Sequence, residues 1–404
     1  MTFSGRRSNN CTNKPVQCSR SLERLERSES QWRKKVQSSA PEDPRWQKLA
    51  SHIARTLEIV QDSRVSIFVN DAGALDASEA LTSAARKLGA RTQTLFRSER
   101  EDASELLYSS AESIAEAPAI ERAAMDWSTV HVSFRAMVWP ETPLDPPSDL
   151  STRLAAQRQA KGAISTLRWQ NTKWAIVRVP TAEWAEKVDV SFDALLDEFF
   201  AGSLDDWDAR KVQWASLDRA VDDAREILIV SPDTNLRLGV AGRRSAMFAG
   251  EANLPDGEIA TAPLDSEVSG HITFPGLTVF AGQRIENLRL AFANGEVVEI
   301  HADTGGDIAK ALIATDAGSR RVGELGIGTN AHITSWTGDL FIDEKILGSV
   351  HIALGRAYPQ CGGINESTLH WDIVKDLRGD NRGSLLVDDV PIVERGVVVW
   401  PGLT

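Results

Sequence analysis

The sequence predicts an α/β protein, with an N-terminal open α/β sheet domain followed by a C-terminal, mainly antiparallel, β-rich α+β domain. Up to about residue 242, short β-branched runs alternate with longer amphipathic stretches, which is typical of a parallel sheet with crossover helices. Beyond it, many short strands are separated by Gly, Asn and Asp turns. A chain of 404 residues is also too long for one ordinary core. We therefore predict domains over 45–242 and 243–404, preceded by a basic polar tail over 1–44.

The predicted parallel sheet begins with a buried strand over 65–70 (VSIFVN). Apolar residues at helical spacing then indicate a helix over 78–88, and Gly89 is a typical C-terminal stop for it. The next strand covers 91–96. The same alternation continues along the chain and predicts strands at 130–135, 173–179 and 227–230, with helices at 150–168 and 191–200.

The C-terminal domain is predicted from its turns. Asn294-Gly295 stands between two alternating apolar runs, which is a strong hairpin signal. A helix is expected over 306–315, and no repeat of 20–50 residues is visible.

Composition and charge exclude several classes of protein. The net charge of −12 disfavours a nucleic-acid partner, because such binding needs a concentrated basic face. The first forty residues carry nine Lys and Arg against three Glu, and we interpret them as a solvated tail, with a binding arm as the alternative. No secretory leader and no apolar run of about 18 residues is found, so no membrane partner is expected. Three cysteines, Cys11, Cys18 and Cys361, cannot all pair, which favours a reducing compartment and a cytoplasmic location.

Histidines concentrate in the β-rich half, where five of the seven occur. His370 and Asp372 alternate with apolar residues in LHWDIV, and in a strand their side chains project from the same face while Trp371 and Ile373 enter the other. On a helix the pair would diverge by about 200°, so the interpretation requires a strand. Surface positions are predicted for three others, His271, His301 and His332.

Four further residues are candidate ligands. His351 lies in the alternating run SVHIALG, where a buried histidine needs either a hydrogen-bond partner or a metal. Glu324 lies among glycines and apolar residues in GELGIGTN, a segment that lacks both the G-x-G-x-x-G pattern and the lysine of phosphate-binding loops. Glu258 opens a strand after a turn, and Glu344 lies in a charged turn before His351; solvated side chains are the alternative for both.

Several carboxylates with two imidazoles form a mixed ligand set that suits zinc, cobalt or manganese better than copper or an iron–sulfur cluster. Two such ions bridged by a carboxylate would share a water and lower its pKa toward neutrality. The residues therefore indicate a two-metal site that supplies a hydroxide nucleophile.

At these residues the sequence resembles the aminopeptidase T family of metallopeptidases, which includes bacterial aminopeptidase S and leucyl aminopeptidase relatives. The resemblance covers most of the chain from about residue 45 and is most specific in the last 150 residues, while 1–40 have no recognised counterpart. The matching segments are NLPDGEIATAP, GELGIGTN, LFIDEKILGSVHIALGRAYP, GGINESTLHWDIV and DDVPIVERG.

The resemblance implies metal ligands at Glu258, Glu324, His351, His370 and Asp372, with Glu344 as a sixth. It also implies two divalent ions, zinc or cobalt first and manganese or magnesium as alternatives, a homodimer, and a cavity between the domains. The implied reaction is release of N-terminal residues from short peptides by a metal-activated water. Glu324 would bridge the metals or shuttle the proton, and Tyr358 would donate a hydrogen bond to the tetrahedral oxyanion.

Two alternatives to a peptidase are considered. Some relatives of this fold are mononuclear non-haem iron dioxygenases that open hydroxypyridine rings, and they need two histidines, one carboxylate and open positions for oxygen. The second alternative is a non-catalytic binding protein that uses the crevice of the N-terminal sheet. The number of candidate ligands favours the two-metal peptidase.

Overall fold

The computed structural model describes residues 43–140, 149–280 and 282–403. The chain divides after Pro44, and Arg45–Thr404 form one compact unit, which is the unit whose fold follows. The predicted basic tail, with Cys11 and Cys18, lies outside the described residues except for its last two positions. Among the described residues, no helix combines the length and the apolar character needed to cross a bilayer.

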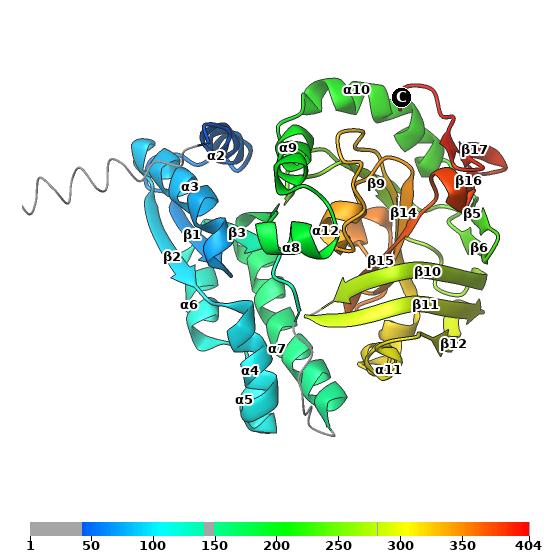
Figure 1. Ribbon diagram of the computed structural model, residues 1–404, viewed down its shortest axis with the longest axis horizontal. Helices are drawn as coiled ribbons and strands as arrows, with labels where there is room; N and C mark the ends of the chain where they lie inside the picture. Colours follow the sequence, from blue (N-terminus) through cyan, green and yellow to red (C-terminus); the bar gives the residue numbers. More distant parts are fainter. Residues whose placement is uncertain (1–42, 141–148, 281, 404) are drawn as a thin grey trace, which may run out of the picture. The chain divides into compact units, whose positions relative to one another are not determined.

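One sheet of this unit is parallel, and its strands β1, β2 and β3 are labelled in Figure 1. Its strand order is β2-β1-β3-β4-β8. Neighbouring strands pair in parallel throughout. The inner strand β3 is buried along nearly its whole length, as expected where helices cover both faces. The strands are β1 (Arg64–Val69), β2 (Arg91–Phe96), β3 (Val130–Ala136), β4 (Lys173–Val179) and the short β8 (Asn253–Leu254).

Helices connect these strands, and the predicted ones are found close to their expected positions. The helix predicted at 78–88 corresponds to α3, that at 150–168 to α7, and that at 191–200 to α9. The others were not predicted. The full set is α2 (Arg45–Thr56), α3 (Leu75–Lys87), α4 (Glu99–Tyr108), α5 (Ala111–Ile114), α6 (Ala119–Trp127), α7 (Leu150–Asn171), α8 (Ala182–Lys187), α9 (Phe192–Ser203) and α10 (Trp207–Asp222).

A larger antiparallel sheet has the order β12-β11-β10-β6-β5-β16-β17-β18. The predicted hairpin at Asn294-Gly295 is confirmed, since both residues have positive φ and join β11 to β12. The strands are β5 (Glu226–Ser231), β6 (Thr234–Gly239), β10 (Val268–Phe280), β11 (Gln283–Ala293), β12 (Glu296–His301), β16 (Ser384–Val387), β17 (Val390–Glu394) and β18 (Val397–Val398).

The assignment of 227–230 to the parallel sheet is wrong. These residues form β5, which pairs in antiparallel fashion with β6 and β16. Burial along β5 alternates, with Ile227 and Ile229 fully buried and their neighbours partly exposed, which is the pattern of a sheet covered on one face. The fifth position in the parallel sheet is taken instead by β8. Strands β5 and β6, which precede residue 242, thus belong to an antiparallel sheet, whereas β8, which follows it, belongs to the parallel one. The division into domains at residue 242 stays a prediction.

The third sheet, with order β15-β14-β13-β9-β7, is entirely antiparallel. It contains every strand that was predicted to carry a metal ligand. The strands are β7 (Ser245–Phe248), β9 (Glu258–Thr261), β13 (Val322–Gly328), β14 (Ser349–Gly355) and β15 (His370–Asp376); the helices of this region are α11 (Gly306–Leu312), α12 (Leu340–Asp343) and the 3-10 turns Ala317–Arg320, Pro359–Cys361 and Gly379–Asn381.

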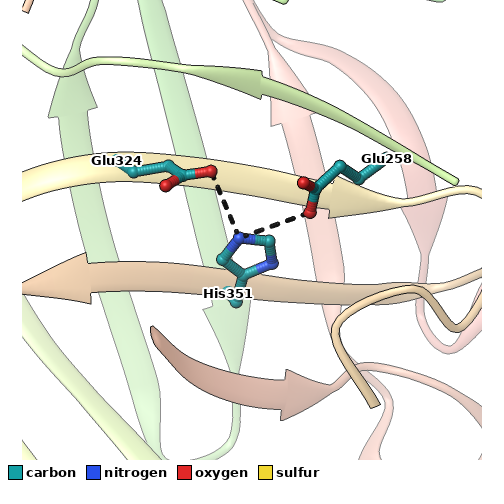
Figure 2. Close-up of side chains that lie close together, drawn as sticks. All are labelled: Glu258, Glu324 and His351. Atoms are coloured by element: carbon teal, nitrogen blue, oxygen red, sulfur yellow. Dashed lines mark ion pairs between the residues drawn. The ribbon is translucent and has the colours of Figure 1, made fainter. Parts of the chain in front are cut away.

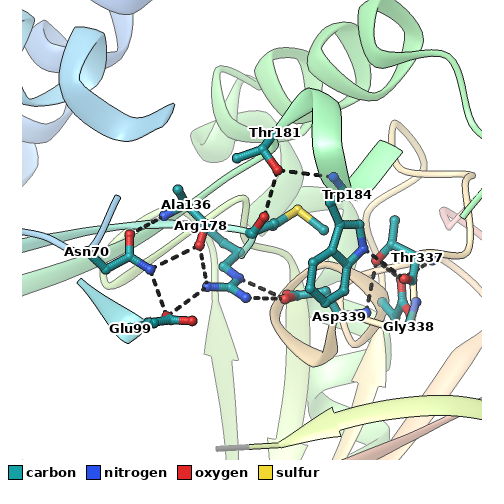
Figure 3. A network of polar contacts seen from close by, with 11 residues as sticks. Asn70, Glu99, Ala136, Arg178, Thr181, Trp184, Thr337, Gly338 and Asp339 are labelled. Atoms are coloured by element: carbon teal, nitrogen blue, oxygen red, sulfur yellow. Dashed lines mark hydrogen bonds and ion pairs between the residues drawn. The ribbon is translucent and has the colours of Figure 1, made fainter. Parts of the chain in front are cut away.

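A buried ion pair connects the parallel sheet to the segment that leads into α12 (Figure 3). Arg178 on β4 donates to Asp339 Oδ2 from Nε and Nη2, at 2.8 and 2.5 Å, and to the carbonyl of Ala136 at 3.1 Å. On the same segment, the carbonyl of Thr337 accepts from the Trp184 indole at 3.0 Å. These contacts hold the start of α12 against the parallel sheet, and α12 leads directly into Glu344 and Lys345.

Candidate metal centre

One face of the β15-β14-β13-β9 sheet collects the predicted ligands. In antiparallel pairing, residues directly opposite each other point to the same face. Glu258 on β9 pairs with Gly328, two residues from Gly326 on β13, and Gly326 pairs with His351 on β14. Glu324 and Asp372 both pair with Ala353, and His370 pairs with Gly355. The period of two in each strand therefore places all five predicted strand ligands on one face.

The opposite face of this sheet belongs to the hydrophobic core. Trp371 and Ile373, predicted to point away from the imidazole and carboxylate, are fully buried there, together with Leu325, Ile327 and Ile352. Burial of these large apolar side chains fixes which face of each strand is turned to the core. The ligand face is held in register as a consequence.

Small residues between the ligands form the floor of the site. A Cβ atom on Gly326 would lie 2.0 Å from His351 Cε1 and 2.3 Å from its Nε2, so the imidazole occupies the space where a side chain would stand. Gly323 and Gly328 are equally confined, because a Cβ on either would meet a backbone oxygen at 2.2 or 2.1 Å. The glycines of GELGIG thus serve close packing of strands and ligands, a role that the sequence analysis did not assign to them.

The predicted ligands form three overlapping groups whose ligand atoms lie within 4.8 Å of one another. Figure 2 shows the first, in which His351 Nε2 lies 3.6 Å from Glu324 Oε1 and 3.7 Å from Glu258 Oε2. These separations are too long for hydrogen bonds. The groups are Glu258, Glu324 and His351; Glu324, His370 and Asp372; and Glu344, His351 and Asp372. We call these six residues the ligand cluster.

Two features of the ligand cluster fit a bound cation. Within the described ranges, Glu258 Oε2 and His351 Nδ1 are buried and make no hydrogen bond, which is costly unless something else satisfies them. His370 Nδ1 lies 2.8 Å from the carbonyl oxygen of Arg356, which can only accept, so Nδ1 carries the proton. Nε2 is then left to face Glu324 at 3.2 Å and Asp372 at 3.3 Å, the orientation typical of a metal-ligating histidine.

Electrostatics also favour a cation. Burial lowers the pKa of His351, but the surrounding carboxylates outweigh it and raise the value to about 9. Burial raises the pKa of Asp372, yet the charge of His370 and its hydrogen bond lower it to about 2. Burial, with Asp372 and Glu258 nearby, raises the pKa of Glu344 to about 8. The cluster holds protons that a divalent ion would displace.

Lys345 is a charged residue of this site that the sequence analysis missed. Its side chain is fully buried, and Nζ lies 2.9 Å from both Glu258 Oε1 and Glu344 Oε1 and 3.9 Å from Asp256 Oδ1. Burial lowers its pKa, but these carboxylates raise the value well above 10.5. A permanent positive charge therefore offsets part of the negative charge of the cluster. The available signal was a lysine directly beside Glu344, in a short charged run that is flanked by apolar residues (LFIDEKIL).

Tyr358 lies beside the cluster, as the sequence analysis expected. It follows β14, and its ring centroid is 5.7 Å from that of His370. Burial and the neighbouring carboxylates, Glu324 first, raise the pKa of its phenol well above 10, so the hydroxyl keeps its proton and can donate a hydrogen bond. By contrast, His271, His301 and His332 belong to none of the ligand groups found among the described residues.

A cavity of about 1020 Å³ gives access to the cluster. Its lining includes Glu258, Glu324, Glu344, His351, His370, Asp372 and Tyr358 from the antiparallel part, and it extends to β1, β3 and β4 of the parallel sheet. This volume is at the upper end for sites that bind small molecules. It suits an extended ligand such as a short peptide.

Replacing Gly326 with Ala is expected to displace the His351 imidazole, because the added Cβ would overlap the ring. A misplacement of about 1 Å at a reacting centre costs on the order of 10²-fold in rate, and a comparable loss of activity is expected here. Gly306→Ala is the matched control, since the nearest atom to its Cβ is 4.0 Å away. Metal content and activity of both variants are to be measured. Equal activity of Gly326→Ala and wild type would contradict the close packing of His351.

The fold combines one parallel and two antiparallel sheets, and it carries a set of carboxylates and imidazoles of the kind that metallohydrolases use. The chain belongs to the family described as thermophilic metalloprotease (M29), whose family model matches residues 42–396. It is therefore an enzyme that hydrolyses peptide bonds and depends on divalent metal. The expected family resemblance is confirmed.

Characterised relatives match over much of the chain. Aminopeptidase AmpS of Bacillus subtilis (strain 168) is 28% identical over 280 residues, which are 57% of this chain and 68% of the relative. Aminopeptidase T of Thermus aquaticus is 26% identical over 294 residues, or 62% of this chain and 72% of the relative. Aminopeptidase PepS of Streptococcus thermophilus is 24% identical over 370 residues, or 80% and 86%.

Two solved structures share the fold. Wild-type AmpT from Thermus thermophilus superposes with a TM-score of 0.70 at 23% identity, covering 88% of this chain and 99% of that one. A 2,5-dihydroxypyridine dioxygenase from Pseudomonas putida KT2440 superposes with a TM-score of 0.53 at 13% identity, covering 89% and 98%. The predicted fold class, an N-terminal parallel α/β sheet with a C-terminal antiparallel β-rich part, is confirmed. At these identities the likeness concerns the fold alone.

Proposed function

We propose that this enzyme is an aminopeptidase that removes N-terminal residues from short peptides. The observation that carries the proposal is the ligand cluster: four carboxylates and two imidazoles in three overlapping groups, on the wall of a large cavity. The names of the matched relatives, which are aminopeptidases, support the same reaction.

The ligand cluster would hold two divalent ions, zinc or cobalt in first place, with manganese or magnesium as alternatives. Such ions, when bound, lower the pKa of a water and polarise a carbonyl oxygen. Glu324 belongs to two of the three groups, and it would either bridge the two ions or shuttle the proton. Tyr358 donates a hydrogen bond to the oxyanion, and Lys345 holds Glu258 and Glu344 in place.

The ring-cleaving dioxygenase is not favoured. A mononuclear iron site of that kind uses two histidines and one carboxylate and leaves positions open for oxygen. Here Glu258, Glu324, Glu344 and Asp372 all lie with the two histidines. The matched dioxygenase shares the fold at 13% identity, which carries no argument for its chemistry.

The homodimer and the cytoplasmic location belong to the proposal as well. The homodimer is implied by the family resemblance, and the cytoplasmic location is inferred from the cysteine content. A mass near 44.2 kDa for the full chain in solution would contradict the dimer.

The proposed activity is tested with metal-stripped protein and a panel of aminoacyl amides and dipeptides. Adding zinc or cobalt is expected to restore release of the N-terminal residue, with two ions bound per chain, whereas ferrous iron is expected to cause no oxygen uptake. N-acetylated versions of the same peptides are the control, because an aminopeptidase needs the free amine. Hydrolysis of the acetylated peptides at equal rates, or one iron with oxygen uptake, would overturn the proposal.

A further inference from the structure

Four arginines line the same cavity as the ligand cluster, and we call them the arginine group. Arg135 comes from β3, Arg158 and Arg168 from α7, and Arg356 from the segment after β14. They approach from both the parallel sheet and the antiparallel part. The cavity therefore has a cationic wall in addition to its acidic, ligand-bearing one.

The arginine group takes part in none of the ion pairs of the described residues. Within residues 43–140, 149–280 and 282–403, no carboxylate forms an ion pair with any of the four, whereas the other cations that line the cavity are paired. Arg97 pairs with Asp102 at 2.8 Å and Glu121 at 2.5 Å, Lys161 with Asp102, and Arg178 with Asp339 at 2.5 Å. Asp102 and Glu121, whose charges act on Arg135, are thus already paired with other cations.

Aromatic rings support the guanidinium groups in place of acids. Arg168 lies 4.6 Å from the centroid of Trp174, and Arg356 lies 4.8 Å from that of Trp169. Arg158 and Arg135 lie over Phe280 and Phe341, at 4.8 and 5.7 Å. A planar guanidinium on an aromatic face keeps its edge N–H donors free for a ligand.

Arg168 is the clearest case of a buried guanidinium with unused donors. Arg168 is only 9% exposed. Its Nη2 donates a hydrogen bond to Ser165 Oγ at 3.0 Å, whereas its Nε makes no hydrogen bond within the described part of the chain. The Nε of Arg356 is likewise buried and without a hydrogen bond there. Burial, with Arg135 and Arg356 nearby, lowers the pKa of Arg168 to about 9. A buried guanidinium with unused donors is costly, and an incoming anion would remove that cost.

The arginine group lies next to the proposed catalytic residues. The ring of Trp169 stacks on that of Tyr358, with centroids 6.2 Å apart, and on that of Trp174, with centroids 6.0 Å apart. Arg356 is two residues from Tyr358, and its carbonyl accepts the His370 hydrogen bond at 2.8 Å. The aromatic row thus leads from the ligand cluster to Arg356 and Arg168. A peptide whose amino end lies at the cluster would extend its other end along this row.

We propose that the arginine group is a carboxylate-binding subsite, which selects short peptides carrying a carboxylate a residue or two beyond the bond that is cut. The proposal rests on the proposed aminopeptidase function. Arginine is suited to this task because its fork of donors matches the two oxygens of a carboxylate. The carboxylate is that of the peptide C-terminus or of an acidic side chain, and both present the same group.

Three substrates distinguish these sources: Leu-Gly-Gly with a free carboxylate, the same peptide as its C-terminal amide, and Leu-Gly-Glu amide. For the wild-type holoenzyme, kcat/KM for a carboxylate-bearing peptide is expected to exceed that of the Leu-Gly-Gly amide by about 10- to 100-fold, the effect of one charged hydrogen-bond pair. A higher kcat/KM for Leu-Gly-Gly than for Leu-Gly-Glu amide identifies the C-terminus as the recognised group. A higher kcat/KM for Leu-Gly-Glu amide than for Leu-Gly-Gly identifies the acidic side chain as the recognised group.

Arg168→Gln and, separately, Arg158→Gln are expected to bring this ratio toward one, because each removes a guanidinium donor. Arg158 is less buried than Arg168, so its variant keeps the test decisive should Arg168→Gln fail to fold. Arg122→Gln is the matched control: Arg122 is exposed on α6 and does not line the cavity, and its variant is expected to keep the wild-type ratio. Equal kcat/KM for all three peptides in wild type would overturn the carboxylate subsite alone. Absence of hydrolysis of every peptide would instead overturn the aminopeptidase function.

Discussion

Glu324→Gln is expected to reduce peptide hydrolysis by about 10²–10⁴-fold, the range for loss of a proton-transfer group, and to lower the bound metal below that of wild type. Glu324 lies between His351 and His370, at 3.6 and 3.2 Å, and shares a ligand group with each. The amide cannot carry the negative charge that bridges two cations, nor accept the proton of a water. Metal content and kcat are the quantities to measure.

Tyr358→Phe is the matched variant for this experiment. It removes one hydroxyl, leaves every residue of the ligand cluster unchanged, and is expected to lower kcat by about 10²–10³-fold, as for loss of one oxyanion donor. Its metal content is expected to equal that of wild type. Full peptidase activity in Glu324→Gln would contradict the proposed role of Glu324. Loss of metal in Tyr358→Phe would contradict the assignment of Tyr358 to the oxyanion alone, because it would show that Tyr358 also supports metal binding.

Lys345→Met is expected to lower the free energy of unfolding by about 3–5 kcal/mol, the usual cost of breaking a buried ion pair from one side. The change leaves Glu258 and Glu344 buried without the ammonium that lies 2.9 Å from each. Unfolding in urea of the metal-stripped protein measures the effect. Stripping the metal matters, because bound ions would neutralise the same carboxylates.

The loss in Lys345→Met also depends on pH. Burial raises the folded-state pKa of Glu344 to about 8, above its ordinary value, so the folded protein binds this proton more tightly than the unfolded chain does. Stability from that proton is present at low pH and is lost as the pH rises through about 8. The deficit of the variant is therefore expected to be larger above this pKa than below it. Lys310→Met is the control, since its ammonium is exposed and its pairing with Asp307 at 3.4 Å is worth little. A similar loss in both variants would contradict the role of Lys345.

Much of the fold could be predicted because its signals are local. Strand β4 has its predicted bounds, and the Asn294-Gly295 turn forms its hairpin, since both depend on nearby side chains and on backbone conformation. The sheet that a strand joins is not a local property. Residues 227–230 form a strand as predicted, but β6 and β16 decide its pairing, and their contribution is not visible in those four residues.

By itself, the sequence determined that His370 and Asp372 share one face of a strand while Trp371 and Ile373 take the other, because a strand has a side-chain period of two. The family resemblance extended this to the other candidate ligands. Only the tertiary structure decided that Gly326 lies beneath His351, that Lys345 offsets the carboxylates, and that Arg168 has no acidic partner among the described residues. Those facts depend on the register between strands and on the burial of charges from distant segments. Neither is specified by the order of residues within any one element.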